Sequence, residues 1–430
     1  MKKICVLTLG CKVNQYESSS LLDQFKQYGY LPTDNENDAD IIIINTCTVT
    51  NRTDFKSRNL LRKALSLKNA KPSLMVYATG CYAQRYPEEI RELGMIDGII
   101  DNQAKADPGA WFGQLNYHFL SNIQQADEFN YIPAQTMFER TRAFQKIQDG
   151  CNFYCNYCAV PHARGKSRSS HFEDVIAQAE LFVQNGYREI VLGGVNLGLY
   201  HDPQSDKDLA DVVIALDKIS GLEIIRLSSI EPQLFSARLL EAISASRKVA
   251  PHFHIPLQSG CDQTLIAMGR KYLTSDVSRL VQEIRSIHPL AAIGMDIICG
   301  FPGETDTDFR NSYDFVQSLH LSYLHAFSFS KRKGTPAYNA PNQINGRIIR
   351  QRTAALVALS DDMKAEFITL LISTRQNLKG FIESSEEGLA TALSDHYIRI
   401  YCPHDKAGGM LTITPERAYQ DGIIGSQLRI

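Results

Sequence analysis

The sequence predicts an α/β protein with three structured parts: an N-terminal open parallel α/β domain, a central partial (β/α)6 barrel and a small C-terminal β-barrel. Two observations predict this architecture. Short apolar strand patterns alternate with helical patterns over most of the chain, which is typical of parallel sheets joined by crossover helices. After a long helical stretch, residues 380–430 show only short β-like segments separated by glycine-containing turn signals.

Length and composition agree with a folded protein of several domains. The 430 residues leave room for about three domains of roughly 150 residues. The formal net charge of -2 excludes a uniformly basic nucleic-acid-binding surface, although local basic patches remain possible. No uncharged apolar stretch reaches the roughly 18 residues that a membrane helix needs. The apolar run at residues 4–9 is also shorter than that of a signal peptide. We therefore expect a cytoplasmic protein.

Residues 1–115 are expected to form the N-terminal α/β domain, and residues 116–142, which show no clear periodicity, a linker. The apolar runs predict strands at residues 4–9, 41–44, 74–78 and 96–100. Helical spacing predicts helices over residues 14–28 and 52–68.

Residues 143–342 are expected to form the partial barrel, residues 343–379 a helical connection and residues 380–430 the C-terminal β domain. The expected barrel strands are residues 144–148, 189–192, 223–227, 252–255, 292–297 and 323–327. Helices are expected between them, for example over residues 173–184, 209–218, 275–287 and 304–319. A barrel of this kind carries its chemistry on the loops that follow the strands.

A tight group of three cysteines, Cys151, Cys155 and Cys158, follows the first expected barrel strand. In a cytoplasmic protein such a group indicates metal binding rather than disulfides. A structural zinc site would need a fourth ligand, for which His162 and His171 are the nearest candidates. A [4Fe–4S] cluster held by three thiolates would instead leave one iron open to bind and reduce a small molecule.

Together with Tyr157, which precedes the last cysteine, this motif resembles the radical S-adenosylmethionine (SAM) superfamily. The resemblance implies that the open iron binds SAM, that the cluster cleaves SAM to a 5'-deoxyadenosyl radical, and that the barrel has six units. Within the superfamily, the chain resembles the methylthiotransferases. The runs that carry this likeness are residues 8–18, 45–50, 79–84, 146–152 and 158–169.

Three further cysteines, Cys11, Cys47 and Cys81, each lie two or three residues past the end of an expected strand. Ligands of open α/β sheets bind beyond the carboxyl ends of the strands, so these thiols are expected to converge on one rim. The alternative is three unrelated buried thiols. In the methylthiotransferases these positions hold a second [4Fe–4S] cluster, whose open iron would hold the sulfur to be inserted. The other cysteines, Cys5, Cys261, Cys299 and Cys402, are expected to be packed thiols.

Residues after successive barrel strands are candidates for SAM binding. Glycines after the second strand would let the backbone approach a ligand closely, and in the family this loop lines the methionyl group. Glu231 has a simpler alternative as a helix-start acid, and His254 as a packed core histidine. The expected SAM contacts are Tyr157, Gly193, Gly194, Asn196, Ser229, Glu231 and Gln258.

The resemblance implies a tRNA methylthiotransferase that uses two [4Fe–4S] clusters and two SAM molecules per turnover. The run at residues 10–18 looks most like the branch that modifies C2 of N6-threonylcarbamoyladenosine at position 37, next to the anticodon. The partners would be the tRNA anticodon stem-loop, an electron donor and a sulfur source, and the protein would be a monomer. The alternatives are another tRNA adenosine, an aspartate of a ribosomal protein, or a non-enzymatic iron–sulfur RNA-binding protein. No side-chain catalytic triad is expected.

Nucleic-acid contacts are suggested by two features. The C-terminal part loosely resembles the RNA-binding TRAM barrel of the family. Basic residues also cluster along the chain, where they would serve either as ordinary solvated surface or as phosphate contacts. These clusters are Arg52/Lys56/Arg58/Arg62/Lys63, Arg164/Lys166/Arg168, Lys331/Arg332/Lys333 and Arg347/Arg350/Arg352.

Overall fold

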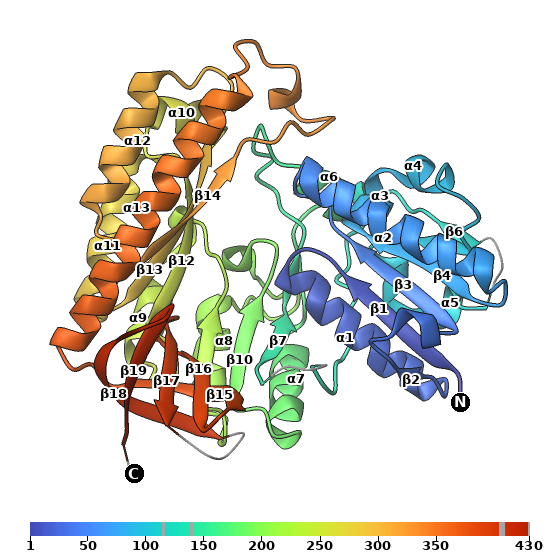
Figure 1. Cartoon of the computed structure of the whole chain (residues 1–430), viewed down its shortest axis with the longest axis horizontal. Helices are drawn as coiled ribbons and strands as arrows, with labels where there is room; N and C mark the ends of the chain where they lie inside the picture. The colour runs from blue at the N-terminus through green and yellow to red at the C-terminus, as the bar shows by residue number, and fades with distance from the viewer. Residues whose placement is uncertain (114–116, 138–140, 404–408, 429–430) are drawn as a thin grey trace.

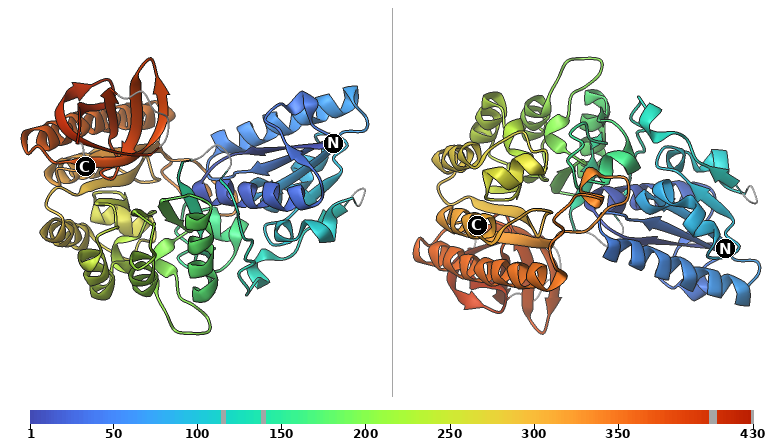
Figure 2. Two further views of the ribbon diagram at one scale, coloured as in Figure 1. Left: turned by 90° about the horizontal axis from the view of Figure 1, so that it is seen from below. Right: turned by 90° about the horizontal axis from the view of Figure 1, so that it is seen from above.

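The computed structural model describes residues 1–113, 117–137, 141–403 and 409–428, and it shows the three expected parts (Figure 1). The N-terminal part contacts the first strand of the central part through its helix at Lys12–Gln27, and the C-terminal barrel packs against the long helix that precedes it (Figures 1 and 2). Among the described helices, none combines the length and the apolar character that a membrane crossing requires.

The N-terminal part is a six-stranded, fully parallel sheet in the order β2-β1-β3-β4-β5-β6. Its strands are β1 (Lys3–Thr8), β2 (Leu31–Pro32), β3 (Ile41–Thr46), β4 (Met75–Gly80), β5 (Gly98–Ile100) and β6 (Tyr117–Phe119). Its helices are α1 (Lys12–Gln27), α2 (Asn51–Ala70), α3 (Cys81–Arg85), α4 (Pro87–Arg91) and α5 (Pro108–Trp111). Strand β3 is buried along its whole length, as its uninterrupted apolar run predicts for a strand covered on both faces.

The central part contains the six expected parallel strands, arranged as two three-stranded halves of a partial barrel. The halves are β7 (Ala143–Lys146), β10 (Glu189–Gly193) and β11 (Ile224–Leu227), followed by β12 (His252–Gln258), β13 (Ala292–Cys299) and β14 (Tyr323–Ser328). They meet where the Ile230 N–H donates to the carbonyl oxygen of His254, at 3.2 Å. The surrounding helices are α7 (Phe172–Gln184), α8 (Leu209–Asp217), α9 (Ala237–Ala245), α10 (Asp262–Ala267), α11 (Thr274–Ile287) and α12 (Asp306–Ser318).

A short hairpin carries the cysteine loop out of the first barrel strand. It pairs β8 (Gln148–Asp149) with β9 (Arg168–Ser169), and between them lie the cysteine loop and helix α6 (Val160–Arg164). The hairpin therefore holds the two ends of the cysteine loop next to each other, beyond the carboxyl end of β7.

Helix α13 (Gly346–Ser373) runs along the outside of the barrel and leads into a closed C-terminal barrel. The barrel strands, in the order β15-β16-β17-β19-β18, are β15 (Leu378–Glu386), β16 (Leu389–Ser394), β17 (Arg399–Pro403), β19 (Gly422–Gln427) and β18 (Met410–Tyr419). The turn before β17 closes the base of the central barrel, because the Tyr397 ring stacks on His252 with centroids 4.2 Å apart.

The segment expected to be a linker is bound tightly to both neighbours. Its strand β6 extends the N-terminal sheet, and its later residues form a strap across α1 and α7. The Tyr16 hydroxyl donates to the carbonyl oxygen of Ile132 at 2.7 Å, and the Gln178 side chain bonds both the N–H and the carbonyl of Ala134. This segment therefore fixes the N-terminal part against the barrel.

Candidate functional site

The early trio, Cys11, Cys47 and Cys81, lies at the carboxyl edge of the N-terminal sheet. Cys11 precedes α1, Cys47 directly follows β3, and Cys81 is the first residue of α3 after β4. Gly10 allows the chain before α1 to approach Cys47 closely. It has a φ of +95°, and a Cβ at this position would lie 2.6 Å from the Cys47 sulfur. The structure thus brings together three thiols that are separated by more than thirty residues.

The thiols of the early trio are close enough to influence one another electrostatically. Burial raises the pKa of Cys47 to about 12, and the charges of Cys81 and Cys11 add to the effect. Burial also raises the pKa of Cys11, against the opposing influence of the Arg164 guanidinium. A free thiolate is therefore disfavoured here at neutral pH, and a bound metal centre is what deprotonates such thiols. The donor set fits an iron–sulfur cluster.

Arg164 connects the early trio to the cysteine loop. It ends helix α6, and its fully buried guanidinium donates from Nε to the Cys81 sulfur at 3.2 Å. The same guanidinium bonds the carboxylates of Glu17 and Asp149, both at 3.0 Å, and the Asn14 side chain at 2.6 Å. One side chain thus joins α1, α3 and the barrel hairpin.

Two buried lysines complete this network. Lys105 lies 2.5 Å from one Glu17 oxygen and Lys146 lies 2.8 Å from the other, while Lys146 also pairs with Asp149 at 2.6 Å. Burial alone would raise the pKa of Glu17, but Arg164, Lys105 and Lys146 hold it well below its usual range. Three cations facing two carboxylates leave a net positive charge beside Cys81, which favours an anionic, thiolate-ligated centre.

The loop trio, Cys151, Cys155 and Cys158, is surrounded by N–H donors. Arg270 Nη1 lies 3.1 Å from the Cys155 sulfur, and Asn196 Nδ2 lies 3.9 Å from the Cys151 sulfur. Burial raises the pKa of Cys158 to about 12, with Cys155 adding to the effect. Hydrogen bonds to sulfur are one of the ways in which proteins tune thiolate-bound clusters.

The spacing of the sulfurs distinguishes a site for an iron–sulfur cluster from a site for a single zinc ion. Thiolates on one tetrahedral zinc lie about 3.8 Å apart, as follows from a Zn–S bond of about 2.3 Å. Among the described residues, neither trio has all three sulfurs within 4.8 Å of one another. A cubane, whose thiolates bind separate irons, suits this wider spacing. The two histidines considered as a fourth zinc ligand have other neighbours: His171 faces Asp202 at 3.3 Å, and the His162 ring packs against Tyr154.

The glycine loop after β10 approaches the cysteine loop as the sequence predicts. Gly193 ends β10, and a Cβ on Gly194 would lie 2.8 Å from the Gln148 side-chain oxygen. That oxygen accepts from the Asn196 N–H at 2.8 Å. The Asn196 side-chain oxygen is buried without a hydrogen-bond partner among the described residues. It therefore remains free to accept a hydrogen bond from a ligand at this rim.

Two of the other expected SAM contacts, Glu231 and Tyr157, are bound by a single arginine. Glu231 forms an ion pair with Arg270, and the Tyr157 hydroxyl accepts from Arg270 Nη1 at 3.4 Å. Gln258 ends β12 with a φ of +69°, at a register shift between β12 and β13. Arg270, which no motif in the sequence indicates, is thus the residue that links the loop trio to Glu231.

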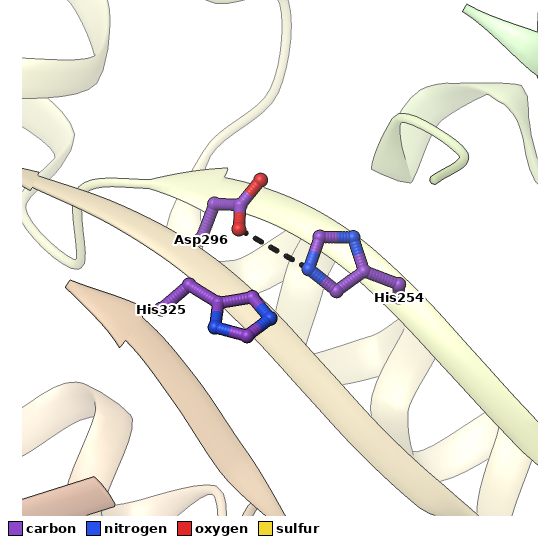
Figure 3. A group of neighbouring side chains, drawn as sticks. All are labelled: His254, Asp296 and His325. Atoms are coloured by element: carbon purple, nitrogen blue, oxygen red, sulfur yellow. Dashed lines mark ion pairs between the residues drawn. The ribbon is translucent and has the colours of Figure 1, made fainter. Parts of the chain in front are cut away.

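Three polar side chains meet on the inner face of the second half-barrel (Figure 3). His254 of β12, Asp296 of β13 and His325 of β14 point toward one another, and their ligand atoms lie within 4.8 Å. His254 Nε2 is 3.1 Å from Asp296, and its Nδ1 is 2.7 Å from the Ser229 hydroxyl. His254 is therefore part of a polar group in the barrel lumen rather than a packed core histidine.

Several of the basic residues considered for RNA contact are buried and paired. Besides Arg164, Arg332 bonds Asp54 at 2.7 Å and Arg352 bonds Glu304 at 2.5 Å. These arginines hold elements together and are not exposed to phosphates, which corrects that part of the surface hypothesis.

Comparisons with known proteins agree with this arrangement. Residues 3–101 match the family described as "Uncharacterized protein family UPF0004", and residues 146–316 match the radical SAM superfamily. The chain is 36% identical to "Threonylcarbamoyladenosine tRNA methylthiotransferase MtaB" of Bacillus subtilis, over 93% of this chain and 90% of the relative. It is 33% identical to "tRNA-2-methylthio-N(6)-dimethylallyladenosine synthase" of Alkaliphilus oremlandii, over 85% and 79%.

A solved structure shares the fold. The radical SAM methyltransferase TsrM from Kitasatospora setae aligns with a TM-score of 0.57 and 15% identity, over 79% of this chain and 77% of that one. The likeness extends the fold assignment beyond the central barrel.

Proposed function

Since this chain belongs to the radical SAM methylthiotransferase family, we propose that it adds a methylthio group to C2 of N6-threonylcarbamoyladenosine at position 37 of tRNA. The observation that carries the proposal is the presence of two cysteine trios, with buried Arg164, from the hairpin that carries the loop trio, donating to Cys81 of the early trio. The names of two relatives that are 36% and 35% identical to this chain support the choice of this modified adenosine. A second candidate substrate is the dimethylallyl-modified adenosine, which is favoured by the relatives that act on it by name.

We further propose that the loop trio holds the cluster that binds SAM and that the early trio holds a second [4Fe–4S] cluster. When bound, these clusters and two SAM molecules per turnover supply the electron, the radical, the methyl group and the sulfur. The chain positions them: Arg270 and Arg164 donate N–H groups to Cys155 and Cys81, and Asn196 faces the rim with a free carbonyl oxygen.

In this function the glycine loop, Ser229, Glu231, Gln258 and Tyr157 border the space for SAM. The partners are the tRNA anticodon stem-loop, an electron donor and a sulfur source, and the protein acts as a monomer in the cytoplasm. All ten cysteines are unpaired, as a reducing compartment requires for two thiolate-bound clusters.

The test is nucleoside mass spectrometry of tRNA from cells that lack this gene. We expect loss of 2-methylthio-N6-threonylcarbamoyladenosine, accumulation of its unmethylthiolated precursor, and recovery when the gene is restored. Loss of the dimethylallyl product instead would select the second candidate. A tRNA profile that does not change would contradict both.

A further inference from the structure

Three polar side chains on the inner face of the second half-barrel border a region of the lumen, called the chamber below, and none of the three is fully buried. On the inner face of the second half-barrel, His254, Asp296 and His325 converge, as Figure 3 shows. Below them His252 bonds the Tyr323 hydroxyl at 2.8 Å and stacks on Tyr397 of the C-terminal part. The buried His252 and the rings that contact it therefore occupy the lumen on the side away from the cysteine loop.

Lys12 faces this chamber from the N-terminal part. It directly follows Cys11, and its Nζ lies 5.9 Å from the centre of the Phe144 ring on β7. Its charge reaches His252 and His325, since it contributes to lowering the pKa of each, after burial as the main cause. Lys12 therefore lies beside the first barrel strand and within electrostatic reach of His325 on the last one.

Lys12 has no carboxylate partner of its own. The side chain is accessible to solvent, and no ion pair to it occurs among the described residues. The nearby carboxylate that acts on it, Glu189, is already paired with Arg226. An ammonium group without a counter-ion of its own favours an anionic group from a ligand.

A divalent cation is the other ligand that the three converging side chains suggest, and the local charge opposes it. A metal ion bound by two imidazoles and one carboxylate would keep a net positive charge. Lys12 adds a further positive charge on the same side, and Asp296 is already in contact with His254. The chamber therefore suits an anion that also brings hydrogen-bond donors.

We propose that this chamber binds the threonylcarbamoyl side chain of the substrate adenosine, with Lys12 and His325 contacting its carboxylate and Asp296 accepting a hydrogen bond from its N–H or hydroxyl group. This inference rests on the proposed function. N6 and C2 lie on the same edge of the purine ring. Anchoring the N6 substituent beside Lys12 therefore brings C2 toward the neighbouring Cys11. Lys12 thus acts as a specificity-determining residue.

The experiment uses anticodon stem-loop RNA that carries N6-threonylcarbamoyladenosine, and the same RNA with the threonyl carboxylate converted to a primary amide. Binding to the cluster-loaded full chain is measured without SAM, and KM and kcat are then measured with SAM and dithionite. The variants are Lys12→Met, Lys12→Arg and His325→Leu. Lys218→Met serves as the matched control, because Lys218 is exposed at the end of α8. Iron content is determined for each variant.

We expect the unaltered protein to bind the acid about tenfold more tightly than the amide, as a charge-assisted contact would require. Lys12→Met should raise the Kd and KM for the acid to the values for the amide, with kcat changed much less. Lys12→Arg and Lys218→Met should keep the preference. If Lys12→Met loses iron, the test is made with His325→Leu, because His325 is far from the cysteine trios in the sequence. This variant should show a reduced preference for the acid over the amide.

Retention of the full preference by both Lys12→Met and His325→Leu would overturn the inference, as would equal binding of the two RNAs by the unaltered protein. In these cases a methylthiolated product would still form, so the proposed function would stand. Absence of product from either RNA, with both clusters present, would instead overturn the proposed function and this inference with it.

Discussion

At the residue scale, Arg164 makes more contacts in the candidate site than its position in the sequence suggested. Its sequence position places it in a basic run, where exposure to phosphates was one interpretation. The structure instead buries it between Cys81, Glu17 and Asp149, which come from three different elements. Removing one partner from a buried charge network leaves the opposite charges uncompensated, and this is far more costly than losing a surface ion pair.

We predict that Arg164→Leu lowers the free energy of unfolding by about 3–5 kcal/mol. Lys105 and Lys146 would still face Glu17, but Asp149 and the Asn14 side chain would lose their guanidinium contacts. Urea denaturation of the anaerobically purified protein measures the change. Arg238→Leu is the matched control, because Arg238 also pairs with two aspartates but is half exposed; it should cost at most about 1 kcal/mol. Equal losses for the two variants would contradict the prediction.

Residue types and spacing were enough to propose the six cysteines as metal ligands and to expect the early trio at one rim of the sheet, because thiols at strand ends and in short loops have few other uses in a reduced protein. The residues that surround them were not predictable in the same way. Arg270 lies 115 positions from Cys155, and Arg164 lies 83 positions from Cys81. Contacts over such distances depend on how the barrel and the N-terminal sheet are packed, which no local pattern encodes.

At the element scale, a strand with a continuous apolar run, such as β3, was predictable from its residues, whereas β6 and β15 were not predicted. Strand β3 is buried on both faces, so its residue types alone identify it. Strand β15 continues from a helical pattern, and its stability comes from pairing with β18, where Leu378 faces Ile413. Strand β6 has three residues and lies in the segment expected to be a linker. Strands β15 and β6 are both paired with strands that are distant in the sequence or that no local pattern links to them.

The strap at residues 131–137 yields a prediction at this scale. The Asp23 carboxylate of α1 accepts from the N–H groups of Gln135, at 2.7 Å, and Thr136, at 3.0 Å. We predict that Asp23→Ala leaves these donors without their acceptor, lowers the free energy of unfolding by about 1–3 kcal/mol and speeds proteolytic cleavage within the strap. Limited proteolysis with mass spectrometry locates the cut. Asp34→Ala, at an exposed aspartate, should leave the cleavage rate unchanged; equal rates for both variants would count against a structural role for the strap.

At the scale of the whole molecule, the two trios belong to separate parts, and Arg164 is the residue through which the hairpin of the loop trio reaches Cys81 of the early trio. The loop trio is supported by Arg270 and Asn196, both of the central barrel, whereas the early trio lies on the rim of the N-terminal sheet.

If each trio holds its own cluster, removing the early trio should leave SAM cleavage intact and abolish only the insertion of sulfur. We therefore predict that replacing Cys11, Cys47 and Cys81 by alanine lowers the iron content from about eight to about four atoms per chain. The variant should still release 5'-deoxyadenosine from SAM and dithionite, but should form no methylthiolated RNA. Replacing Cys5, Cys299 and Cys402, three buried cysteines outside both trios, should change neither quantity. An early-trio variant that kept about eight irons, or still made product, would show that the sulfur-inserting centre lies elsewhere in the chain.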